Sequence, residues 1–242
     1  MEEQTTVTET KKNKKEKKDK KKYSILFKKN RKGRPTSRLL NFLRVIFIPF
    51  YFLVKPFRFY GNRKVPDGAC VFVGNHYTLF DIVYPASLTW AGIHFLSKKE
   101  NIQAPVLGSL CRAVKVISVN RDGNDVRALL DCFKCLKSGE KISVYPEGTR
   151  NKTDAEMLPF KHGAAVMAIK AKVPVVPVML YSKPRFFRCA HVLVGDSVDL
   201  SEFYDKKLTE EEVSKADDKI RDVLLNLRKE HKEYLENKKK KK

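Results

Sequence analysis

From Cys70 onward, short apolar runs typical of β-strands alternate with stretches of helical periodicity, and this alternation constrains the fold more than any other feature. The runs expected to form strands are 70–74, 94–98, 114–119, 141–146, 173–180 and 190–195. The stretches expected to form helices are 80–91, 102–113, 125–137, 160–172 and 210–236, the last opening at a capping box on Thr209. The alternation predicts an α/β fold with a mostly parallel central sheet flanked by helices.

Two polar motifs stand directly after strands of this predicted sheet. "NHYTLFD", residues 75–81, follows the first strand, and "YPEGTR", residues 145–150, follows the fourth. In open α/β sheets, ligands bind beyond the carboxyl ends of the strands. The two motifs are therefore the first candidates for a functional site.

His76 and Asp81 allow two interpretations. Thr78 and Asp81 form a T-x-x-D sequence much like a capping box, so the aspartate could serve only to begin a helix. Alternatively, its carboxylate could hold one imidazole nitrogen of His76 protonated, which would leave the other nitrogen facing a pocket as a general base. The spacing is a weak signal by itself, and both interpretations stay open here.

The second motif also has a structural and a functional interpretation. Glu147 and Arg150 could form a salt bridge in a surface turn, where Gly148 permits a tight bend. In the functional interpretation Arg150 is an anion clamp, because the guanidinium fork matches phosphate, and Arg121 ends near the same rim. Two arginines and a histidine at one sheet edge indicate a phosphorylated substrate whose hydroxyl must lose a proton.

The charge of the chain is concentrated at its ends. Fifty Lys and Arg residues oppose 28 Asp and Glu, a formal net charge of +22. Residues 11–34 hold fourteen basic residues and two acidic ones, and five lysines occupy 238–242. Such runs cannot bury a core, so we expect 1–37 to be a disordered arm and 237–242 a lysine tail. They are either solvated tails or counter-ions for a polyanion, which could be anionic lipid or nucleic acid.

Residues 39–61 form the most apolar segment, and we interpret 38–61 as a helical segment that associates with a membrane. The charge-free part, 45–54, is ten residues long, whereas a spanning helix needs about 20. A buried core helix is the alternative, but many Phe and Tyr residues flanked by Lys and Arg favour a helix pair dipping into one leaflet. With the basic arm directly before it, this segment favours an anionic membrane surface over nucleic acid. Residues 62–236 then form the α/β domain.

The cysteines and the remaining histidines suggest structural roles. The five cysteines are an odd number in a chain with no expected cleaved signal, which favours reduced thiols. "CFKC", residues 132–135, falls in a predicted helix and has no second pair at ligand spacing, which favours ordinary helix residues over a metal or redox site. His94 and His191 belong to predicted strands, and His231 lies on a charged helix face, so none of the three is expected to be catalytic.

The motifs, taken in order, resemble those of the glycerolipid acyltransferase family that includes the 1-acyl-sn-glycerol-3-phosphate acyltransferases. Asn75, His76 and Asp81 fill its N-H-x-x-x-x-D signature. Three further blocks match "VISVNR" at 116–121, "PEGTR" at 146–150 and "VPVVPV" at 173–178, and "LPFKHGAAVMA" resembles the stretch before the last block. Two positions depart from the family pattern: Asn120 stands where aspartate is common, and His162 where lysine is common. These departures bear on acceptor preference.

The resemblance implies an enzyme that moves a fatty acyl group from a thioester to the free hydroxyl of lysophosphatidic acid, making phosphatidic acid in phospholipid biosynthesis. His76 is implied as the general base and Asp81 as its orienting partner, with direct transfer and no acyl-enzyme. The implied substrate-binding residues are Asn75, Lys99, Arg121, Glu147, Gly148, Thr149 and Arg150. Glu147 would orient an arginine or a substrate hydroxyl.

The resemblance also implies which cofactors the protein needs and where in the cell it is located. No bound cofactor or metal is expected, and the donor is either acyl-CoA or acyl carrier protein. A monotopic or peripheral place on the cytoplasmic face of the cell membrane is implied. The open alternatives are glycerol-3-phosphate or another lysophospholipid as acceptor, a thioester or lipid hydrolase, and a basic lipid- or RNA-binding protein with a dead site.

Overall fold

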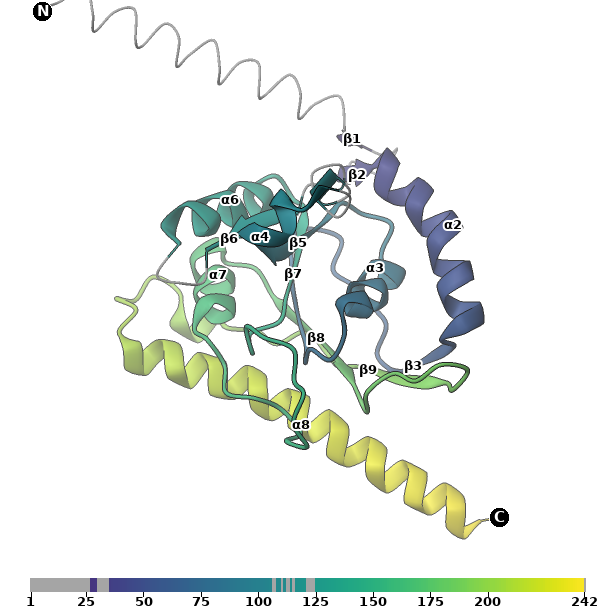
Figure 1. Ribbon diagram of the computed structural model, residues 1–242. Coiled ribbons are helices and arrows are strands. Elements are labelled where there is room, and N and C mark those ends of the chain that lie inside the picture. Colours follow the sequence, from purple (N-terminus) through teal and green to yellow (C-terminus); the bar gives the residue numbers. More distant parts are fainter. Residues whose placement is uncertain are drawn as a thin grey trace, which may run out of the picture.

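The computed structural model describes residues 27–29, 35–105, 108–109, 111, 114, 116–120 and 125–241 (Figure 1). Its centre is a seven-stranded sheet with the strand order β3-β9-β8-β4-β7-β5-β6. The strands are β3 (Phe57–Gly61), β4 (Val71–Val73), β5 (Ile93–Lys98), β6 (Ile117–Val119), β7 (Lys141–Val144), β8 (Val175–Leu180) and β9 (Ala190–Val194). Every neighbouring pair is parallel except β8 and β9. The predicted α/β class with a mostly parallel sheet is confirmed.

Helices cover both faces of this sheet (Figure 1). Alternate residues of β4 point to opposite faces: Val71 and Val73 pack in the core beneath α6, α7 and α8, whereas Phe72 packs in the core beneath α2 and α3. All six residues of β8 are buried, as expected for a central strand covered on both sides. The helices are α2 (Arg38–Val54), α3 (Val83–Leu88), α4 (Lys99–Gln103), α6 (Val126–Lys137), α7 (Gly163–Ala171) and α8 (Glu210–Lys240), with 3₁₀ turns η1 (Leu79–Ile82) and η2 (Ser201–Phe203).

The apolar segment 38–61 is not the helix pair that the sequence suggested. Its first part is the single helix α2, but Phe57–Gly61 forms the edge strand β3, with Phe57 opposite Ala190 in β9. The sequence does not predict β3, because "FRFYG" follows an apolar helix without a polar linker. The central sheet therefore includes residues that the sequence assigned to the membrane segment. Within the described part of the chain, no helix has the length and hydropathy needed to cross a membrane.

Helix α2 turns Arg44 inward and most of its large apolar side chains outward. Arg44 is 5% exposed, and its guanidinium donates to the carbonyl oxygen of Ala91 at 3.1 Å and to Oδ1 of Asn41 at 2.6 Å. Burial lowers the pKa of Arg44 to about 10. The helix is thus anchored by Leu40, Arg44 and Tyr51, while large apolar side chains of the opposite face are exposed: Phe42, Val45, Ile46, Phe50 and Leu53.

The two basic ends differ from the disorder expected for them. Most of the predicted arm 1–37 lies outside the described residues, but Phe27–Lys29 (β1) and Pro35–Ser37 (β2) pair as an antiparallel ribbon. At the other end, α8 continues through Lys240 rather than ending near 236. The predicted capping at Thr209 is confirmed, since its hydroxyl accepts from the backbone N–H of Glu212 at 3.3 Å.

Candidate active site

The two motifs begin at the carboxyl ends of neighbouring strands, as expected. Val73 of β4 stands opposite Val144 of β7. Gly74 then carries the chain past β8, where a Cβ atom would lie 2.0 Å from the carbonyl oxygen of Val178. Only glycine allows this close approach, which brings the first motif over the sheet edge.

His76 and Asp81 are in direct contact. Nδ1 of His76 lies 2.9 Å from Oδ2 of Asp81, and the two side chains are 17% and 1% exposed. An ionised carboxylate can only accept hydrogen bonds, so this contact requires the proton on Nδ1. Nε2 is then left with its lone pair, as a general base requires.

Asp81 also begins the helical turn, so the same carboxylate both caps this turn and contacts His76. Oδ2 accepts from the backbone N–H groups of Tyr77 and Thr78 at 2.6 and 2.8 Å, and Oδ1 accepts from the Thr78 hydroxyl at 2.7 Å. The capping box of η1 is complete. Together with His76, four donors surround this buried carboxylate and fix its position.

Glu147 holds the His76 loop rather than pairing with an arginine. Oε1 accepts from the backbone N–H of His76 at 2.9 Å, and Oε2 accepts from the backbone N–H of Leu158 at 3.0 Å. The residue is 3% exposed, and burial raises the pKa of its carboxyl. The alternative of a surface salt bridge between Glu147 and Arg150 is therefore not what the described residues form. Each oxygen of Glu147 accepts from a backbone N–H, so the residue holds the His76 loop in place, and its role in orienting an arginine or a substrate hydroxyl stays a prediction.

A second bond joins the motifs from the other side of His76. The carbonyl oxygen of His76 accepts from the backbone N–H of Asn151 at 2.6 Å. The turn that follows β7 thus binds the backbone of His76 through both its N–H and its carbonyl. This coupling depends on atoms that no sequence pattern specifies.

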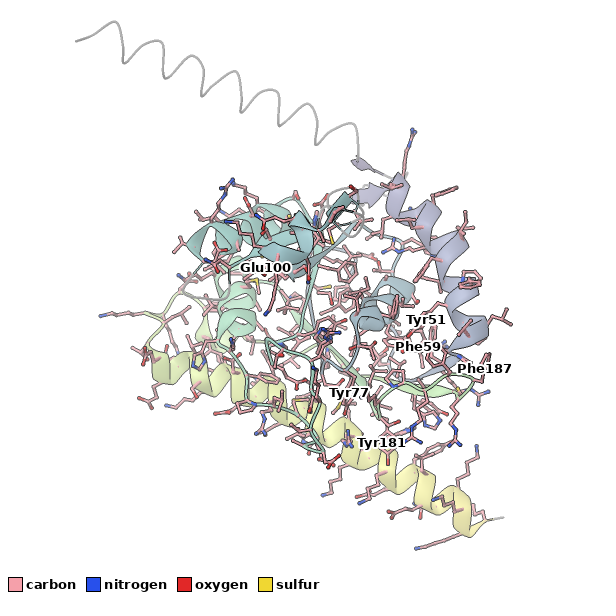
Figure 2. All side chains as sticks on the ribbon, viewed as in Figure 1. Tyr51, Phe59, Tyr77, Glu100, Tyr181 and Phe187 are labelled. Atoms are coloured by element: carbon pink, nitrogen blue, oxygen red, sulfur yellow. The ribbon has the colours of Figure 1, made fainter. Side chains whose placement is uncertain are left out.

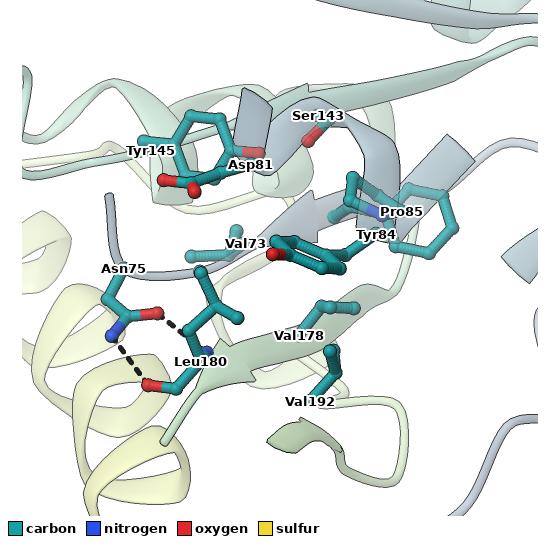
Figure 3. A pocket seen from close by; sticks show the side chains of 12 residues that line it. Val73, Asn75, Asp81, Tyr84, Pro85, Ser143, Tyr145, Val178, Leu180 and Val192 are labelled. Atoms are coloured by element: carbon teal, nitrogen blue, oxygen red, sulfur yellow. Dashed lines mark hydrogen bonds between the residues drawn. The ribbon is translucent and has the colours of Figure 1, made fainter. Parts of the chain in front are cut away.

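Asn75 is a positioning residue rather than a substrate contact. Its amide donates to the carbonyl oxygen of Leu180 at 2.9 Å and accepts from the N–H of Leu180 at 2.8 Å, as Figure 3 shows. The side chain is 2% exposed. Asn75 therefore ties the end of β4 to the end of β8, which corrects its predicted place among the substrate-binding residues.

Tyr145 is a site residue whose contact with the histidine the sequence did not reveal. Its ring stacks on the imidazole of His76 with centroids 4.4 Å apart and planes 11° from parallel. Burial raises the pKa of the Tyr145 hydroxyl well above its usual range. The stacked ring fixes one face of the imidazole. The only sequence signal was its place directly before "PEGTR".

Among the residues that it describes, the structure does not bring those predicted to bind the substrate phosphate as close together as His76 and Asp81. Thr149 and Arg150 are exposed beside the His76 loop, and Gly148 has a φ of 65° with the stem of Lys161 packed against it. Lys99 is exposed at the start of α4 and does not line the cavity described next. Arg121 lies outside the described residues.

A large cavity opens at His76 and runs between α6 and α7. Its volume is about 760 Å³. Its walls are mostly apolar, and they include Leu96, Val119, Ala128, Leu129, Cys132, Val144, Phe160, Ala164, Val166 and Met167. Tyr145, Gly148, Lys161 and His162 lie at the polar end near His76. The sequence predicted these helices but not the space between them.

His162, one of the departures from the family pattern, forms a second His–Asp contact on this cavity. Its Nδ1 lies 2.9 Å from Oδ2 of Asp217 in α8. Asp217 is 4% exposed, and burial raises the pKa of its carboxyl. The imidazole is therefore held by α8 at the edge of the cavity.

The other histidines are structural. His94 pairs with Glu140 at 2.6 Å inside the sheet, close to Cys135, and hydrogen bonds to these two side chains outweigh burial and raise its pKa to about 10. His231 is 6% exposed rather than solvated, and its Nε2 lies 2.8 Å from Nδ1 of His191. Of the two non-catalytic roles, structural or solvated, the buried position of His231 favours the structural one, because α8 turns it onto β9.

The cysteines agree with the expected reduced thiols. Five free cysteines are present, of which Cys189 is exposed and the others are buried. Cys132 and Cys135 lie in α6, as the "CFKC" pattern predicted. Cys135 brings its thiol to the buried pair of His94 and Glu140, a contact that the spacing of "CFKC" could not show.

Comparison with known proteins agrees with this geometry. Residues 56–181 match the acyltransferase family, and both motifs lie within them. A chloroplastic 1-acyl-sn-glycerol-3-phosphate acyltransferase of Brassica napus is 39% identical over 49% of this chain and 35% of its own length. The 1-acyl-sn-glycerol-3-phosphate acyltransferase of Helicobacter pylori is 31% identical over 50% of this chain and 52% of its own. The matched region thus spans about half or less of these relatives.

The fold is shared with a solved structure, the lysophosphatidic acid acyltransferase PlsC from Thermotoga maritima. The TM-score is 0.57 at 23% sequence identity, over 79% of this chain and 78% of PlsC. The sheet and the helices around it therefore have a known counterpart. Since the family match covers about half of its residues and includes the whole His76–Asp81 site, the chain belongs to the acyltransferase family.

Proposed function

We propose that this protein transfers a fatty acyl group from an acyl thioester to the free hydroxyl of lysophosphatidic acid, making phosphatidic acid. The observation that carries the proposal is that the His76–Asp81 pair stands at the opening of the large apolar cavity. A cavity of about 760 Å³ is within the usual range for a ligand pocket, and its walls suit an acyl chain. The names of the relatives support the choice of acceptor.

In the proposed reaction, Nε2 of His76 removes the proton of the acceptor hydroxyl as its oxygen attacks the thioester carbonyl. Asp81 keeps the proton on Nδ1 and stabilises the imidazolium that forms. The thiolate of the donor then leaves and takes up the proton from Nε2. The acyl group passes directly between the two substrates, so the enzyme forms no covalent intermediate.

The backbone amides at the start of η1 are already occupied. The N–H groups of Tyr77 and Thr78 donate to Asp81, and that of His76 donates to Glu147. The oxyanion of the tetrahedral intermediate must therefore be stabilised by other groups, and the exposed turn at Thr149 and Arg150 offers a hydroxyl and a guanidinium for this role. Arg150 and Arg121 are proposed to bind the acceptor phosphate, with Lys99 as a further contact.

The acceptor is a membrane lipid, so we also propose that the enzyme is a monotopic or peripheral protein on the cytoplasmic face of the cell membrane. The exposed apolar face of α2 supports this, because exposed patches of this kind mark interaction sites. The lysine-rich sequence before it favours anionic lipid. The donor is either acyl-CoA or acyl carrier protein.

The proposal is tested by an acyl-transfer assay with a panel of acceptors: lysophosphatidic acid, glycerol-3-phosphate, other lysophospholipids and water. His76→Ala is expected to lower kcat about 10²–10⁴-fold. Asp81→Asn is expected to lower kcat by as much, because an amide cannot fix the same tautomer of His76. Unchanged turnover in a variant with wild-type circular dichroism would reject the assigned base. Release of free fatty acid alone would favour the hydrolase, and RNA binding without transfer would favour the binding protein.

A further inference from the structure

The loop between β8 and β9, residues 181–189, carries two exposed phenylalanines beside α2. Phe186 is 65% exposed and Phe187 is 78% exposed. The backbone N–H of Phe187 donates to the carbonyl oxygen of Val54, the last residue of α2, at 2.9 Å. Figures 1 and 2 show this loop and Phe187 at the C-terminal end of the helix. The loop therefore extends the exposed apolar face of α2.

The same apolar surface continues to the catalytic turn. Lys55 Nζ lies 4.3 Å from the centre of the Phe186 ring and 6.0 Å from that of Phe80. Phe80 is itself 41% exposed, directly precedes Asp81, and stacks against Phe47 of α2 at 6.2 Å. We call the whole set the docking surface: Phe42, Val45, Ile46, Phe50, Leu53, Leu79, Phe80, Phe186 and Phe187.

The backbone of Phe187 gives an independent reason to look for a role for its ring. Its φ is 54°, in the left-handed region that glycine or asparagine adopts at little cost. A bulky side chain in this region is strained, and such strain is typical of functional positions. The ring is also 78% exposed, so burial within the chain does not offset the strain.

The charges on this loop indicate the sign of the partner. Lys183, Arg185 and Arg188 are exposed. None of the three forms an ion pair with another residue that the structure describes. Aromatic residues flanked by free cations are suited to the interface of an anionic bilayer, where the rings enter the acyl boundary and the cations meet the headgroups.

We propose that the β8–β9 loop is a second membrane anchor, which binds an anionic bilayer together with α2 and thereby sets the orientation of the enzyme. One helix lying in an interface leaves the protein free to rotate about the helix axis. A second contact on the β8–β9 loop, which is linked to Phe80 through Lys55, restricts that rotation and directs Phe80, and with it the His76 site, toward the lipid. This orientation rests on the proposed function, whereas the binding of the loop to lipid does not.

The test is sedimentation of the full chain with vesicles of phosphatidylcholine containing phosphatidylglycerol, using Phe186→Ala and Phe187→Gly. Each variant is expected to bind about tenfold more weakly, since each loses one buried aromatic side chain. Leu130→Ala removes an apolar residue that is 52% exposed on α6, away from the docking surface, and should bind as the wild type. A double variant with Arg185→Gln and Arg188→Gln should still bind vesicles. It should lose only the preference for anionic vesicles over vesicles of pure phosphatidylcholine.

Thermal melting separates an anchor from a structural residue. Phe187→Gly relieves the strained backbone, so its melting temperature should be equal to or above that of the wild type while vesicle binding falls. A lower melting temperature would assign the ring to the fold and overturn the proposal. Unchanged vesicle binding by Phe186→Ala and Phe187→Gly would overturn it as well. Transfer to a short-chain, monomeric acceptor is measured in parallel, and its absence in the wild type would reject the proposed function without affecting the binding result.

Discussion

The backbone N–H of His76 donates to Oε1 of Glu147 at 2.9 Å, so the two sequence motifs of this protein are parts of one hydrogen-bonded unit. Glu147 receives a second bond from Leu158 and is 3% exposed. A carboxylate that accepts from two fixed N–H groups in a buried place holds the loop more firmly than a water-exposed contact. The placement of the imidazole therefore depends on a residue 71 positions away.

Glu147→Gln tests this dependence. The amide of glutamine offers one oxygen where Glu147 has two, so one of the two N–H groups meets another donor and loses its bond. A misplaced base is expected to lower kcat about 100-fold, with a loss of about 1–3 kcal/mol in the free energy of unfolding. Enzyme kinetics measure kcat, and urea titration measures the free energy of unfolding. Glu156→Gln is the matched control, since that side chain is 63% exposed, and a similar loss there would contradict the assignment.

Arg150→Ala tests the phosphate clamp. A guanidinium–phosphate hydrogen bond is worth about 1.5–3 kcal/mol, so kcat/KM for lysophosphatidic acid should fall about 10- to 100-fold. Transfer to a monoacylglycerol, which has no phosphate, should be nearly unaffected. Lys152→Ala, at an exposed residue two positions away, serves as the control. Equal losses with both acceptors would count against the clamp.

Ala128→Leu tests whether the large cavity holds the acyl chain. Ala128 lies in α6, lines the cavity and is 5% exposed, so a leucine there occupies space inside it. We expect the variant to discriminate against long acyl donors while retaining short ones, as measured by kcat/KM over a series of chain lengths. Ala155→Leu makes the same exchange at an exposed position outside the cavity and should leave the profile unchanged. A uniform loss across all chain lengths would reject the cavity as the acyl site.

The sequence predicted the sheet well because its strands are short, apolar and separated by helical patterns. Six of the seven strands of the central sheet fall within or next to the expected runs. It missed β3, whose pairing with β9 is a contact 133 positions away in the chain. It also located His76 and Asp81, since their contact is local.

The contributions of Asn75 and Glu147 could not be assigned from the sequence. Both are polar residues inside a motif, which suggests contact with substrate. Their partners are backbone groups of Leu180 and Leu158. Nearly every residue type has such groups, so the sequence does not show which of them will form the bond. The inward position of Arg44 could not be predicted for a similar reason, because its carbonyl partner, Ala91, is far away in the sequence. A residue type alone does not say whether a polar group faces substrate or the backbone.

The pair of His191 and His231 predicts a pH-dependent stability. Burial and the neighbouring His191 lower the pKa of His231 from its ordinary value of 6.5 to about 4. The unfolded chain therefore binds more protons than the folded one between these values, so the free energy of unfolding should fall as the pH is lowered from 6.5 to 4, by up to about 3 kcal/mol. Burial, and after it the nearby cations Arg58 and Lys238, lower the pKa of His191 in the same direction. His231→Phe keeps an aromatic ring against Tyr60 but cannot be protonated, so its urea-unfolding profile should be flatter over this range than that of the wild type. Parallel profiles for the two proteins would show that the acid sensitivity arises elsewhere.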